Sequence, residues 1–465
     1  MEKIPTLSYI KPFVSTRNAC KLCSPLGACI AIKGIEGCVP VIHGSQGCAT
    51  YIRRYMISHY KEPVDIASSN FSEETTIFGG QANLKMALTN VSNQYQPMAI
   101  GVATTCLSET IGEDVASQLS NIRNESTNSV LPDLFTVSTP SYQGTHMDGF
   151  HATILEVVKN FAVKLPSADK INFFPGFISP ADIRHLKEIL SDFDVNSTIL
   201  PDYSDTLDNP IWDQYYRVPK GGTSISELKK MGEAYASVEL GLFTAVKQGG
   251  QNGRKEISGA SYLENEFGIK NHQCIAPIGM NSSDTFFDIL SKVSGKDIPL
   301  KYKMQRGRLL DSYADGHKYI FGKKAVVYGE EDLVLSLCSF LDEIGIEVVL
   351  AASGANSGKL RKQISKHCPE HGENIQVMSD SDFEQINEAC NSLSPDFLIG
   401  NSKGNYIANN FNIPLIRVGF PIHDRIGGQR ISLLGYKGTQ DLFDKVVNAM
   451  IEYKQNNSPI GYKYM

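Results

Sequence analysis

The chain has 465 residues, of which 42% are hydrophobic and 20% charged, and its formal net charge is −6. This composition indicates a globular protein of two to four domains rather than a disordered or fibrous one. An acidic chain without runs of Lys and Arg excludes a nucleic-acid-binding protein and a polybasic membrane-surface protein. It has no apolar stretch of about 18 residues for a membrane span, and its first residues lack a signal-peptide pattern, so we expect a cytoplasmic protein with no membrane partner.

The cysteines are crowded toward the N-terminus. Five of the ten lie between Cys20 and Cys48, and a sixth, Cys106, follows them. Stable disulfides are rare in a reducing compartment, so clustered thiols there indicate metal binding or redox chemistry. The remaining four are scattered, and we interpret them as small buried or surface thiols: Cys274, Cys338, Cys368 and Cys390.

The first part of the chain predicts strands that each end in a turn with a polar or thiol side chain. Residues 39–43 form a short apolar strand that runs into HGSQGC, and apolar periodicity over 49–60 predicts a helix that starts beside Cys48. Two further predicted strands end just before Cys106 and Ser141. The carboxyl ends of parallel strands share one edge of a sheet, so we expect these turns to form a ligand-binding edge.

The strand and helix pattern restarts near residue 170. We predict a helix over 180–190, a long polar insert over 201–222 in which we find no chemistry, and a charged helical segment over 284–321. The predicted strands of this part are 170–176, 195–201, 236–243 and 274–279.

The last part of the chain has the clearest alternation of strands and helices. Five strand candidates alternate with helical stretches, and a helix over 438–454 closes the chain, which predicts a doubly wound parallel sheet. No GxGxxG or GxxxxGK[ST] fingerprint is present, so little favours a nucleotide site. The five candidates are 323–329, 347–354, 374–378, 396–402 and 413–419.

These patterns together predict an α/β protein of three Rossmann-like domains with parallel sheets and flanking helices. We place the N-terminal domain, which carries the cluster cysteines, over 1–165 and the second domain, with its connecting helices, over 166–320. The C-terminal doubly wound domain covers 321–465.

Cys23, Cys48 and Cys106 are the main candidates for metal ligands. They fall in three separate turns, two of them beside glycines or small residues, and iron–sulfur clusters take soft thiolate ligands together with surrounding backbone N–H groups. Their spacing fits no zinc finger, which needs paired CxxC motifs or His partners. Cys20 and Cys23 do form one CxxC, which alone could be a redox pair or half of a zinc site.

Three thiolates are one fewer than a four-thiolate cluster needs. The fourth ligand comes either from one of the remaining N-terminal cysteines, Cys20, Cys29 or Cys38, or from a partner chain. His43, just before the glycine of HGSQGC, could donate a hydrogen bond to a cluster sulfide or cap the end of its strand.

Several phrases across almost the whole chain resemble one family. In chain order they are CSPLGA, HGSQGC, ISHYKEP, SEETTIFGG, TTCLSETIGEDV, TPSYQGTH, RGRLLDSYADGH, GNSKGNY and RVGFPIHDR. They are similar to the β-type subunits of the nitrogenase component 1 family. That family contains catalytic molybdenum–iron, vanadium–iron and iron-only β subunits as well as the cofactor-assembly branch represented by NifN.

Within the family, FPIHDRIGGQR and LGYKGTQDLFDKVVN look most like the assembly branch. This resemblance implies a scaffold, without catalytic residues of its own, in an α2β2 heterotetramer with a NifE-like α-type subunit. The complex would receive an iron–sulfur precursor from NifB and mature it to the iron–molybdenum cofactor, with the nitrogenase Fe protein delivering electrons, molybdenum and homocitrate. The partner would hold this transient precursor. Cys48 would bind a cluster at the subunit interface, where the partner supplies the other ligands.

The catalytic β subunit is the alternative within the same family. Cys23, Cys48 and Cys106 match the three β-side cysteines of the eight-iron P-cluster, and Ser141 matches the serine beside it. The interface cluster could therefore be a [4Fe–4S] cluster or a P-cluster-like group. A third hypothesis, from another class, is an unrelated soluble α/β enzyme with a metal or nucleotide site in one chain.

A second metal site is implied by the same resemblance. Glu62, Asp311 and Asp315 match carboxylates that bind a metal ion between two β chains of catalytic complexes. Asp311 and Asp315 are four residues apart on a predicted helix and face the same way, and oxygen ligands suit a hard cation. Two solvated helix carboxylates are the other interpretation of this pair. For Arg53 and Arg54 we expect contact with carboxylates of a partner.

Overall fold

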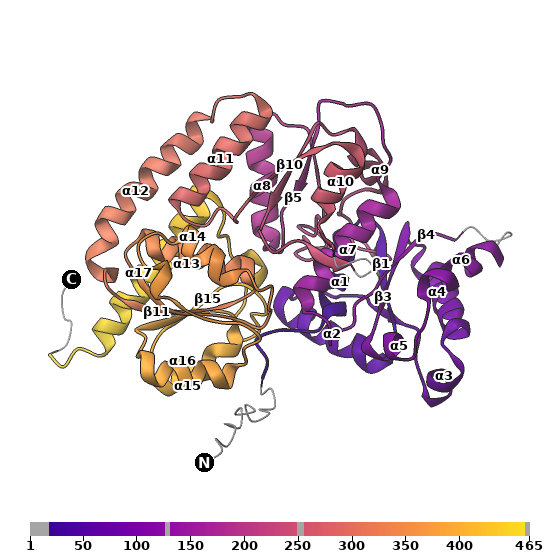
Figure 1. Cartoon of the computed structure of the whole chain (residues 1–465), viewed down its shortest axis with the longest axis horizontal. Helices are drawn as coiled ribbons and strands as arrows, with labels where there is room; N and C mark the ends of the chain where they lie inside the picture. The colour runs from indigo at the N-terminus through magenta and orange to yellow at the C-terminus, as the bar shows by residue number, and fades with distance from the viewer. Residues whose placement is uncertain (1–17, 126–130, 249–254, 461–465) are drawn as a thin grey trace, which may run out of the picture.

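The computed structural model describes residues 18–125, 131–248 and 255–460. Three parallel sheets follow one another along the chain, and helices cover their faces (Figure 1). This confirms the expected α/β fold of parallel sheets with flanking helices. Each sheet lies inside one of the three predicted domains, whose boundaries stay a prediction. In the described ranges no helix combines the length and apolarity that a bilayer crossing requires.

The first sheet has the strand order β2–β1–β3–β4, with all neighbours parallel. Its central strands β1 and β3 are buried along their whole length, as expected for parallel strands with helices on both faces. The strands are β1 (Cys38–His43), β2 (Ala67–Ser68), β3 (Ala99–Thr104) and β4 (Asp133–Val137). The helices are α1 (Ser24–Lys33), α2 (Gln46–Tyr60), α3 (Glu73–Phe78), α4 (Gln81–Tyr95), α5 (Cys106–Thr110), α6 (Val115–Glu125) and α7 (His146–Phe161).

The second sheet has the order β10–β7–β5–β6. Its strands are β5 (Ile171–Phe174), β6 (Ser197–Ile199), β7 (Ala236–Leu240) and β10 (Lys270–Cys274), and a separate antiparallel hairpin joins β8 (Val246–Gln248) and β9 (Lys255–Ile257). The helices are α8 (Pro180–Asp192), α9 (Ile225–Lys229), α10 (Gly259–Phe267), α11 (Met280–Ser294) and α12 (Leu300–Ile320), with the 3₁₀ turn η1 (Lys230–Glu233).

The strand predicted over 274–279 is wrong. Cys274 is the last residue of β10, and the apolar residues after it run outside the sheet. Pro277 and Gly279 interrupt that run, because proline cannot donate to a strand ladder and Gly279 has a φ of 107°. The true strand, KNHQC, is polar and lies at the sheet edge beside β7, so an apolar pattern could not predict it.

The third sheet has the order β13–β12–β11–β14–β15 and is parallel throughout. Its strands are β11 (Lys324–Gly329), β12 (Glu347–Ser353), β13 (Gln376–Met378), β14 (Phe397–Gly400) and β15 (Leu415–Arg417). The helices are α13 (Glu331–Glu343), α14 (Leu360–His367), α15 (Phe383–Leu393), α16 (Asn405–Phe411) and α17 (Gly435–Asn456), with the turns η2 (Gly372–Asn374), η3 (Ser402–Gly404) and η4 (Gly428–Arg430).

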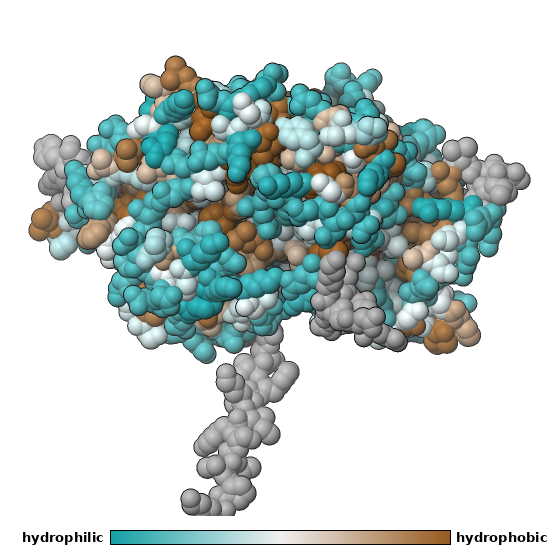
Figure 2. Space-filling model, turned by 45° about the horizontal axis from the view of Figure 1, so that its top comes forward, coloured by the Kyte–Doolittle hydropathy of each residue, from teal (hydrophilic) through white to brown (hydrophobic). Residues whose placement is uncertain are grey.

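One continuous hydrophobic core joins the three sheets, because a single cluster of buried side chains extends from Leu22 to Met450. The long helices α12 and α17 pack together, with Tyr313 and Phe443 at a ring distance of 4.9 Å. The molecular face in Figure 2 is mainly hydrophilic and carries scattered hydrophobic groups. The three sheets therefore form one packed body with a mostly polar exterior on that face.

Helices α1 and α7 meet backbone to backbone. A Cβ atom at Gly27 would lie 1.6 Å from the carbonyl oxygen of His146, and one at Gly149 would lie 1.9 Å from that of Ser24. Only glycine permits this approach. The contact fixes the start of α1, and with it the position of Cys23.

An N-terminal strap, residues 18–22, connects the third sheet with the first. The backbone N–H of Cys20 donates to the Ser381 carbonyl at 3.1 Å, and that of Phe383 donates to the Asn18 carbonyl at 3.1 Å. At the other end of the strap, the Leu22 N–H donates to Nδ1 of His146 at 3.3 Å. The strap thus leads from the third sheet, which the last third of the chain forms, to the start of α1.

Candidate functional site

Three of the predicted ligands lie at the starts of helices. Cys23 is the N-cap residue of α1, Cys48 lies in the first turn of α2, and Cys106 is the first residue of α5. Strands β1 and β3 lead into α2 and α5, and they pair in register up to their last residues, His43 and Thr104. Cys48 and Cys106 therefore follow neighbouring strands at one sheet edge. The dipole of the 15-residue helix α2 favours negative charge on Cys48.

Hydrogen bonds fix the turn that carries Cys106. The Thr105 N–H donates to Ser108 Oγ at 2.8 Å, and the Ser108 N–H donates to Thr105 Oγ1 at 3.4 Å, which is a capping box. The Thr105 hydroxyl also donates to the His43 carbonyl at 3.1 Å. This bond ties the carboxyl end of β3 to that of β1 just before the two thiol-bearing helices.

Ser141 connects two of the thiol-bearing turns. Its backbone N–H donates to Sγ of Cys106 at 3.2 Å, and its Oγ accepts from the backbone N–H of Ser24 at 3.1 Å. Ser24 is the residue directly after Cys23. At the third thiol, the Ser45 hydroxyl donates to Sγ of Cys48 at 3.6 Å.

The three sulfurs share one electrostatic environment. Cys23 and Cys48 are half-buried and Cys106 is exposed. Burial, with a smaller contribution from negative charge on Cys48 and Cys106, raises the pKa of the Cys23 thiol to about 11. A cationic metal group beside the three sulfurs reverses this effect, since a coordinating thiol is held deprotonated by the metal.

The arrangement suits a multi-atom cluster better than a single ion. In the described part of the chain, no three His, Cys, Asp or Glu side chains are grouped closely enough to hold one metal ion. Soft thiolates are the ligands of iron–sulfur clusters. The backbone beside Cys48 is open, because a Cβ atom at Gly47 would meet only Ser45 Oγ, at 3.8 Å. The chemistry of this edge therefore fits an iron–sulfur cluster, and Cys23, Cys48 and Cys106 as its ligands stay a prediction.

The other N-terminal cysteines lie in the core. Cys29 and Cys38 are fully buried, and Cys20 packs against the third sheet. Burial raises the pKa of Cys20 and Cys38 to about 12 and that of Cys29 higher still. Each of these thiols is neutral at physiological pH and lacks the surface position of Cys106.

The ring of His43 packs inside the first domain. It is fully buried, it contacts the ring of Phe71 edge to face at a centroid distance of 4.8 Å, and its Nε2 lies 3.6 Å from Oε2 of Glu113. Burial lowers its pKa. The end of its strand is held by Thr105 rather than by the imidazole.

The predicted carboxylate site does not come together within one chain. Glu62 follows α2, and its Oε1 accepts from the Asn209 N–H at 3.1 Å, while Asp311 and Asp315 lie exposed on α12. Burial raises the pKa of Glu62. A metal ion held by these groups between two copies of the chain stays a prediction.

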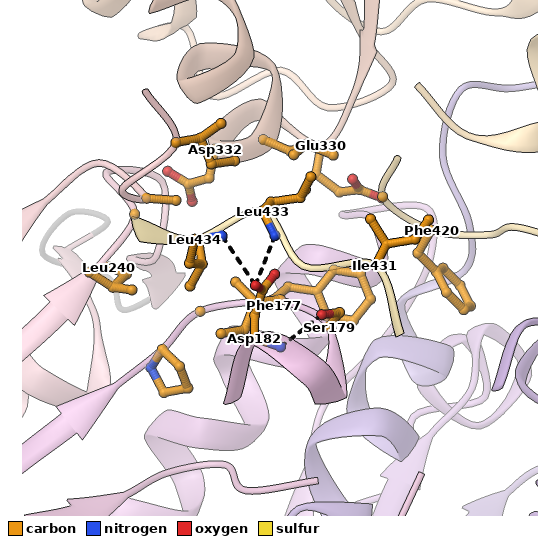
Figure 3. A pocket seen from close by; sticks show the side chains of 18 of the residues that line it. Phe177, Ser179, Asp182, Leu240, Glu330, Asp332, Phe420, Ile431, Leu433 and Leu434 are labelled. Carbon is orange, nitrogen blue, oxygen red and sulfur yellow. Dashed lines mark hydrogen bonds between the residues drawn. The ribbon is translucent and has the colours of Figure 1, made fainter. Parts of the chain in front are cut away.

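Sequence reasoning missed a cavity at the junction of the three sheets (Figure 3). It has a volume of about 70 Å³ and lies beyond the carboxyl ends of β5, β7 and β11. Apolar side chains such as Phe177, Leu240 and Phe420 line most of it. Its lining residues come from positions 59 to 434, so no local pattern could have revealed it.

Carboxylates close this cavity by binding the backbone of neighbouring loops. Asp182 Oδ1 accepts from the N–H groups of Leu433 and Leu434 at 2.9 and 3.1 Å (Figure 3). Asp332 Oδ1 accepts from the Leu242 N–H at 2.6 Å, and burial raises the pKa of Asp332 to about 7. The lining contains no cysteine in the described ranges, so the cavity offers no soft ligand for a thiolate-bound cluster.

Comparison with known proteins agrees with this geometry. The sequence profile of the family described as "Nitrogenase component 1 type Oxidoreductase" matches residues 23–451. The chain is 34% identical over 441 residues to the nitrogenase molybdenum-iron protein beta chain of Clostridium pasteurianum, covering 94% of this chain and 93% of that one. It is 32% identical over 444 residues to the beta chain of Methanothermobacter thermautotrophicus, covering 93% and 94%.

A solved structure has the same fold. A chain of the structure described as "Nitrogenase Cp1 at pH 6.5" superimposes with a TM-score of 0.92, at 32% identity and with 98% of both chains covered. A chain of "Nitrogenase Cp1 at pH 5" has a TM-score of 0.68 at 15% identity, which is a likeness of fold alone.

Proposed function

Because the chain belongs to the nitrogenase component 1 type oxidoreductase family, we propose that it is the β-type subunit of a catalytic nitrogenase complex. In this role it holds its share of an iron–sulfur cluster that an α-type partner completes. The observation that carries the proposal is the meeting of Cys23, Cys48 and Cys106 at one surface edge. The relatives named as molybdenum-iron beta chains support this role over the assembly role that the sequence phrases favoured.

In this role, three cysteines of the chain bind the cluster and a backbone N–H stabilises one of their sulfurs. When bound, an iron–sulfur cluster supplies electron storage and transfer. Cys23 and Cys48 would hold it from half-buried positions and Cys106 from an exposed position, where a partner chain can supply further ligands. The Ser141 N–H, 3.2 Å from Cys106 Sγ, stabilises negative charge on that sulfur. Such bonds tune the reduction potential of a cluster.

A scaffold role in cofactor assembly is the second candidate. The observation in its favour is the resemblance of residues 420–430 and 434–448 to the NifN branch. In that role Cys48 alone contributes to a [4Fe–4S] cluster. A NifE-like partner holds the iron–molybdenum cofactor precursor that NifB supplies, and the Fe protein provides electrons.

The test is to purify the complex with its α-type partner and to measure iron content, the cluster spectrum and substrate reduction with the Fe protein. Iron at the interface together with turnover at nitrogenase-like rates supports the catalytic role. Intact clusters without turnover, combined with transfer of a matured cofactor to a cofactor-free acceptor, support the scaffold. A chain that binds neither iron nor a partner contradicts both roles.

A further inference from the structure

The junction cavity is lined by three carboxyl groups, those of Asp182, Glu330 and Asp332. Asp182 belongs to the first turn of α8 and Asp332 to the first turn of α13, of which Glu330 is the N-cap residue. Figure 3 shows Asp182 and Asp332 on opposite sides of the cavity. Asp182 is 1% exposed and Glu330 is 7% exposed, so both carboxyl groups are shielded from bulk water.

In each of these carboxyl groups the protein uses only one oxygen. Oδ1 of Asp182 accepts from the Ser432 hydroxyl at 3.0 Å as well as from two backbone N–H groups. Oδ1 of Asp332 accepts from two backbone N–H groups, at 2.6 and 3.3 Å. Oε1 of Glu330 lies 3.0 Å from the imidazole at the start of α7. The second oxygen of each group accepts no hydrogen bond from the described residues.

A buried acceptor without a donor indicates a bound water, ion or ligand. In the part of the chain that the structure describes, the cavity lining contains no Lys or Arg. Its imidazole, His59, accepts from the Ile422 N–H at 2.9 Å through Nδ1, and burial lowers the pKa of this ring to about 3. The three carboxyl groups therefore face the cavity without a positively charged side chain in its walls.

The other walls of the cavity favour an organic cation over a bare metal ion. The rings of Phe177 and Phe420 meet edge to face at 5.7 Å, and the ring of Tyr60 stacks on that of Phe420 at 5.9 Å. Aromatic rings attract cations, and apolar walls favour the burial of an alkyl group. The carboxyl groups are also too dispersed for one metal ion, because no three potential ligands among the described residues are grouped closely enough.

The size of the cavity limits the size of its occupant. Its volume of about 70 Å³ is close to half that of a cavity of about 150 Å³ that holds benzene. A molecule of about three or four non-hydrogen atoms therefore fits. A short alkylammonium ion has this size, and its N–H groups are donors for carboxyl oxygens.

We propose that the junction cavity is a binding site for a small organic cation of the alkylammonium class. The free oxygens of Asp182, Glu330 and Asp332 accept hydrogen bonds from the cation, and the aromatic walls contact its alkyl group. The inference does not rest on the proposed function, because Cys23, Cys48 and Cys106 are not part of this lining.

Binding of the cation is linked to the proton on Asp332. Burial, with smaller contributions from the carboxylates of Glu331 and Glu239, raises the pKa of Asp332 to about 7. The other titratable groups in the cavity walls are Asp182, Glu330, His59 and Tyr60. A cation in the cavity favours ionised Asp332, so this group releases its proton to solvent when the cation binds. Affinity should therefore rise about tenfold from pH 6 to pH 8, because the ionised fraction of Asp332 rises from about 0.1 to about 0.9.

The first test is calorimetric titration of the full-length chain with ethylammonium chloride at pH 8. Ethanol serves as the neutral probe, since it has the same number of non-hydrogen atoms. We expect ethylammonium to bind at one site per chain and at least about tenfold more tightly than ethanol, because only the cation compensates the buried carboxylates. Equal affinity for the two probes overturns the proposal. Absence of ethylammonium binding also overturns it, since that result assigns the cavity to water alone.

The second test uses variants to locate the bound cation. Asp332→Asn should weaken ethylammonium binding at pH 8 about tenfold or more and abolish its pH dependence, because the amide carries no charge. Ala276 lines the cavity, so Ala276→Leu should fill the space and prevent binding at every pH. The control is Asp288→Asn, on the exposed face of α11, which should bind like the unaltered chain.

Melting curves establish that each variant is folded, and the smaller substitution Ala276→Val replaces Ala276→Leu if the larger side chain prevents folding. Undiminished binding of ethylammonium in either cavity variant overturns the proposal, because the cation then binds elsewhere on the chain.

Discussion

The cysteines of this chain differ by position rather than by local sequence. Cys48 lies in the first turn of a 15-residue helix at a sheet edge, where Ser45 donates to its sulfur. Cys29, in the next helix toward the N-terminus, is fully buried in the core, and burial raises its pKa far above the usual range. Thiolate character is what makes a cysteine a metal ligand.

We therefore expect Cys48→Ala to remove most of the cluster signal and iron from the purified complex, and Cys29→Ala to keep both. Cys29→Ala should lower stability by about 1 kcal/mol, because it leaves a small void in the core. Iron analysis and electron paramagnetic resonance of the two variants give the result. Full iron with an unchanged spectrum in Cys48→Ala would contradict the assignment of this ligand.

Asp332 predicts a pH effect on stability. Burial raises its pKa from 3.8 to about 7, so on a rise in pH the unfolded chain releases this proton before the folded one does. The free energy of unfolding therefore falls as the pH rises from about 4 to about 7, by at most about 4 kcal/mol. Above pH 7 this group causes no further loss.

Asp332→Asn should abolish this dependence, since the amide oxygen still accepts from the Leu242 N–H. The quantity to follow is the denaturant midpoint of the variant minus that of the unaltered chain. We expect this difference to increase from pH 4 to pH 7 and then to stay constant. Denaturant titrations at several pH values measure it. The exposed Asp288→Asn serves as control, and a parallel trend in that variant would refute the effect.

The packing of α1 on α7 is the contact between elements that positions Cys23. Because Gly27 and Gly149 bring two backbones together, an added methyl group has no room, and neither main chain can move without displacing the helix. Gly307, in the middle of α12, is also helical, but no atom lies within 4 Å of a Cβ atom placed there.

This contrast gives a matched pair of substitutions. We expect Gly27→Ala to destabilise the chain by about 3 kcal/mol or more. Gly307→Ala should instead stabilise it by about 0.5–1 kcal/mol, because alanine loses less backbone freedom in a helix. Calorimetric melting of both variants tests the pair, and a Gly27→Ala protein that melts like the unaltered chain would show that the helices can separate freely.

The elements of the first domain were predictable where strands are apolar and end in turns with distinctive chemistry. The predicted strand over 39–43 is β1, and the turns before Cys106 and Ser141 lie where the strand ends predicted them. The polar edge strand β10 was missed because hydrophobicity placed it four residues too late. The bridge from Ser141 to Ser24 could not be predicted either, because it joins a side chain to a backbone N–H 117 residues away.

Beside the hydrophobic core, buried polar contacts also link the first and third sheets. His146, at the start of α7, accepts from the Leu22 N–H through Nδ1, so in its neutral form Nε2 carries the proton. That Nε2 lies 3.0 Å from Oε1 of Glu330, the N-cap residue of α13 in the third sheet's part of the chain. Both side chains are buried.

Removing one partner should cost much more than removing both. We expect His146→Phe to destabilise the chain by about 3–5 kcal/mol, because it leaves a buried carboxylate without its donor. The double variant His146→Phe with Glu330→Gln should recover part of this loss, since the neutral amide costs less to bury. A double-mutant cycle from unfolding curves measures the coupling, and strictly additive effects would mean that the pair contributes nothing.

The junction cavity is also a property of the whole molecule. Its walls come from helices α2 and α7, from loops of the second and third sheets and from the segment before α17, so it exists only in the complete fold. Patterns in a sequence report on contacts a few residues apart, which explains why the three sheets were predicted and the space between them was not.

The N-terminal strap also sets an order of events during synthesis. Asn18 pairs with Phe383 and Cys20 with Ser381, so the strap cannot take its final position until the ribosome has made more than three quarters of the chain. Cys23 begins the helix that this strap enters. The nascent protein therefore emerges with the strap in front of Cys23 still free, and the strap takes its final position only near the end of translation.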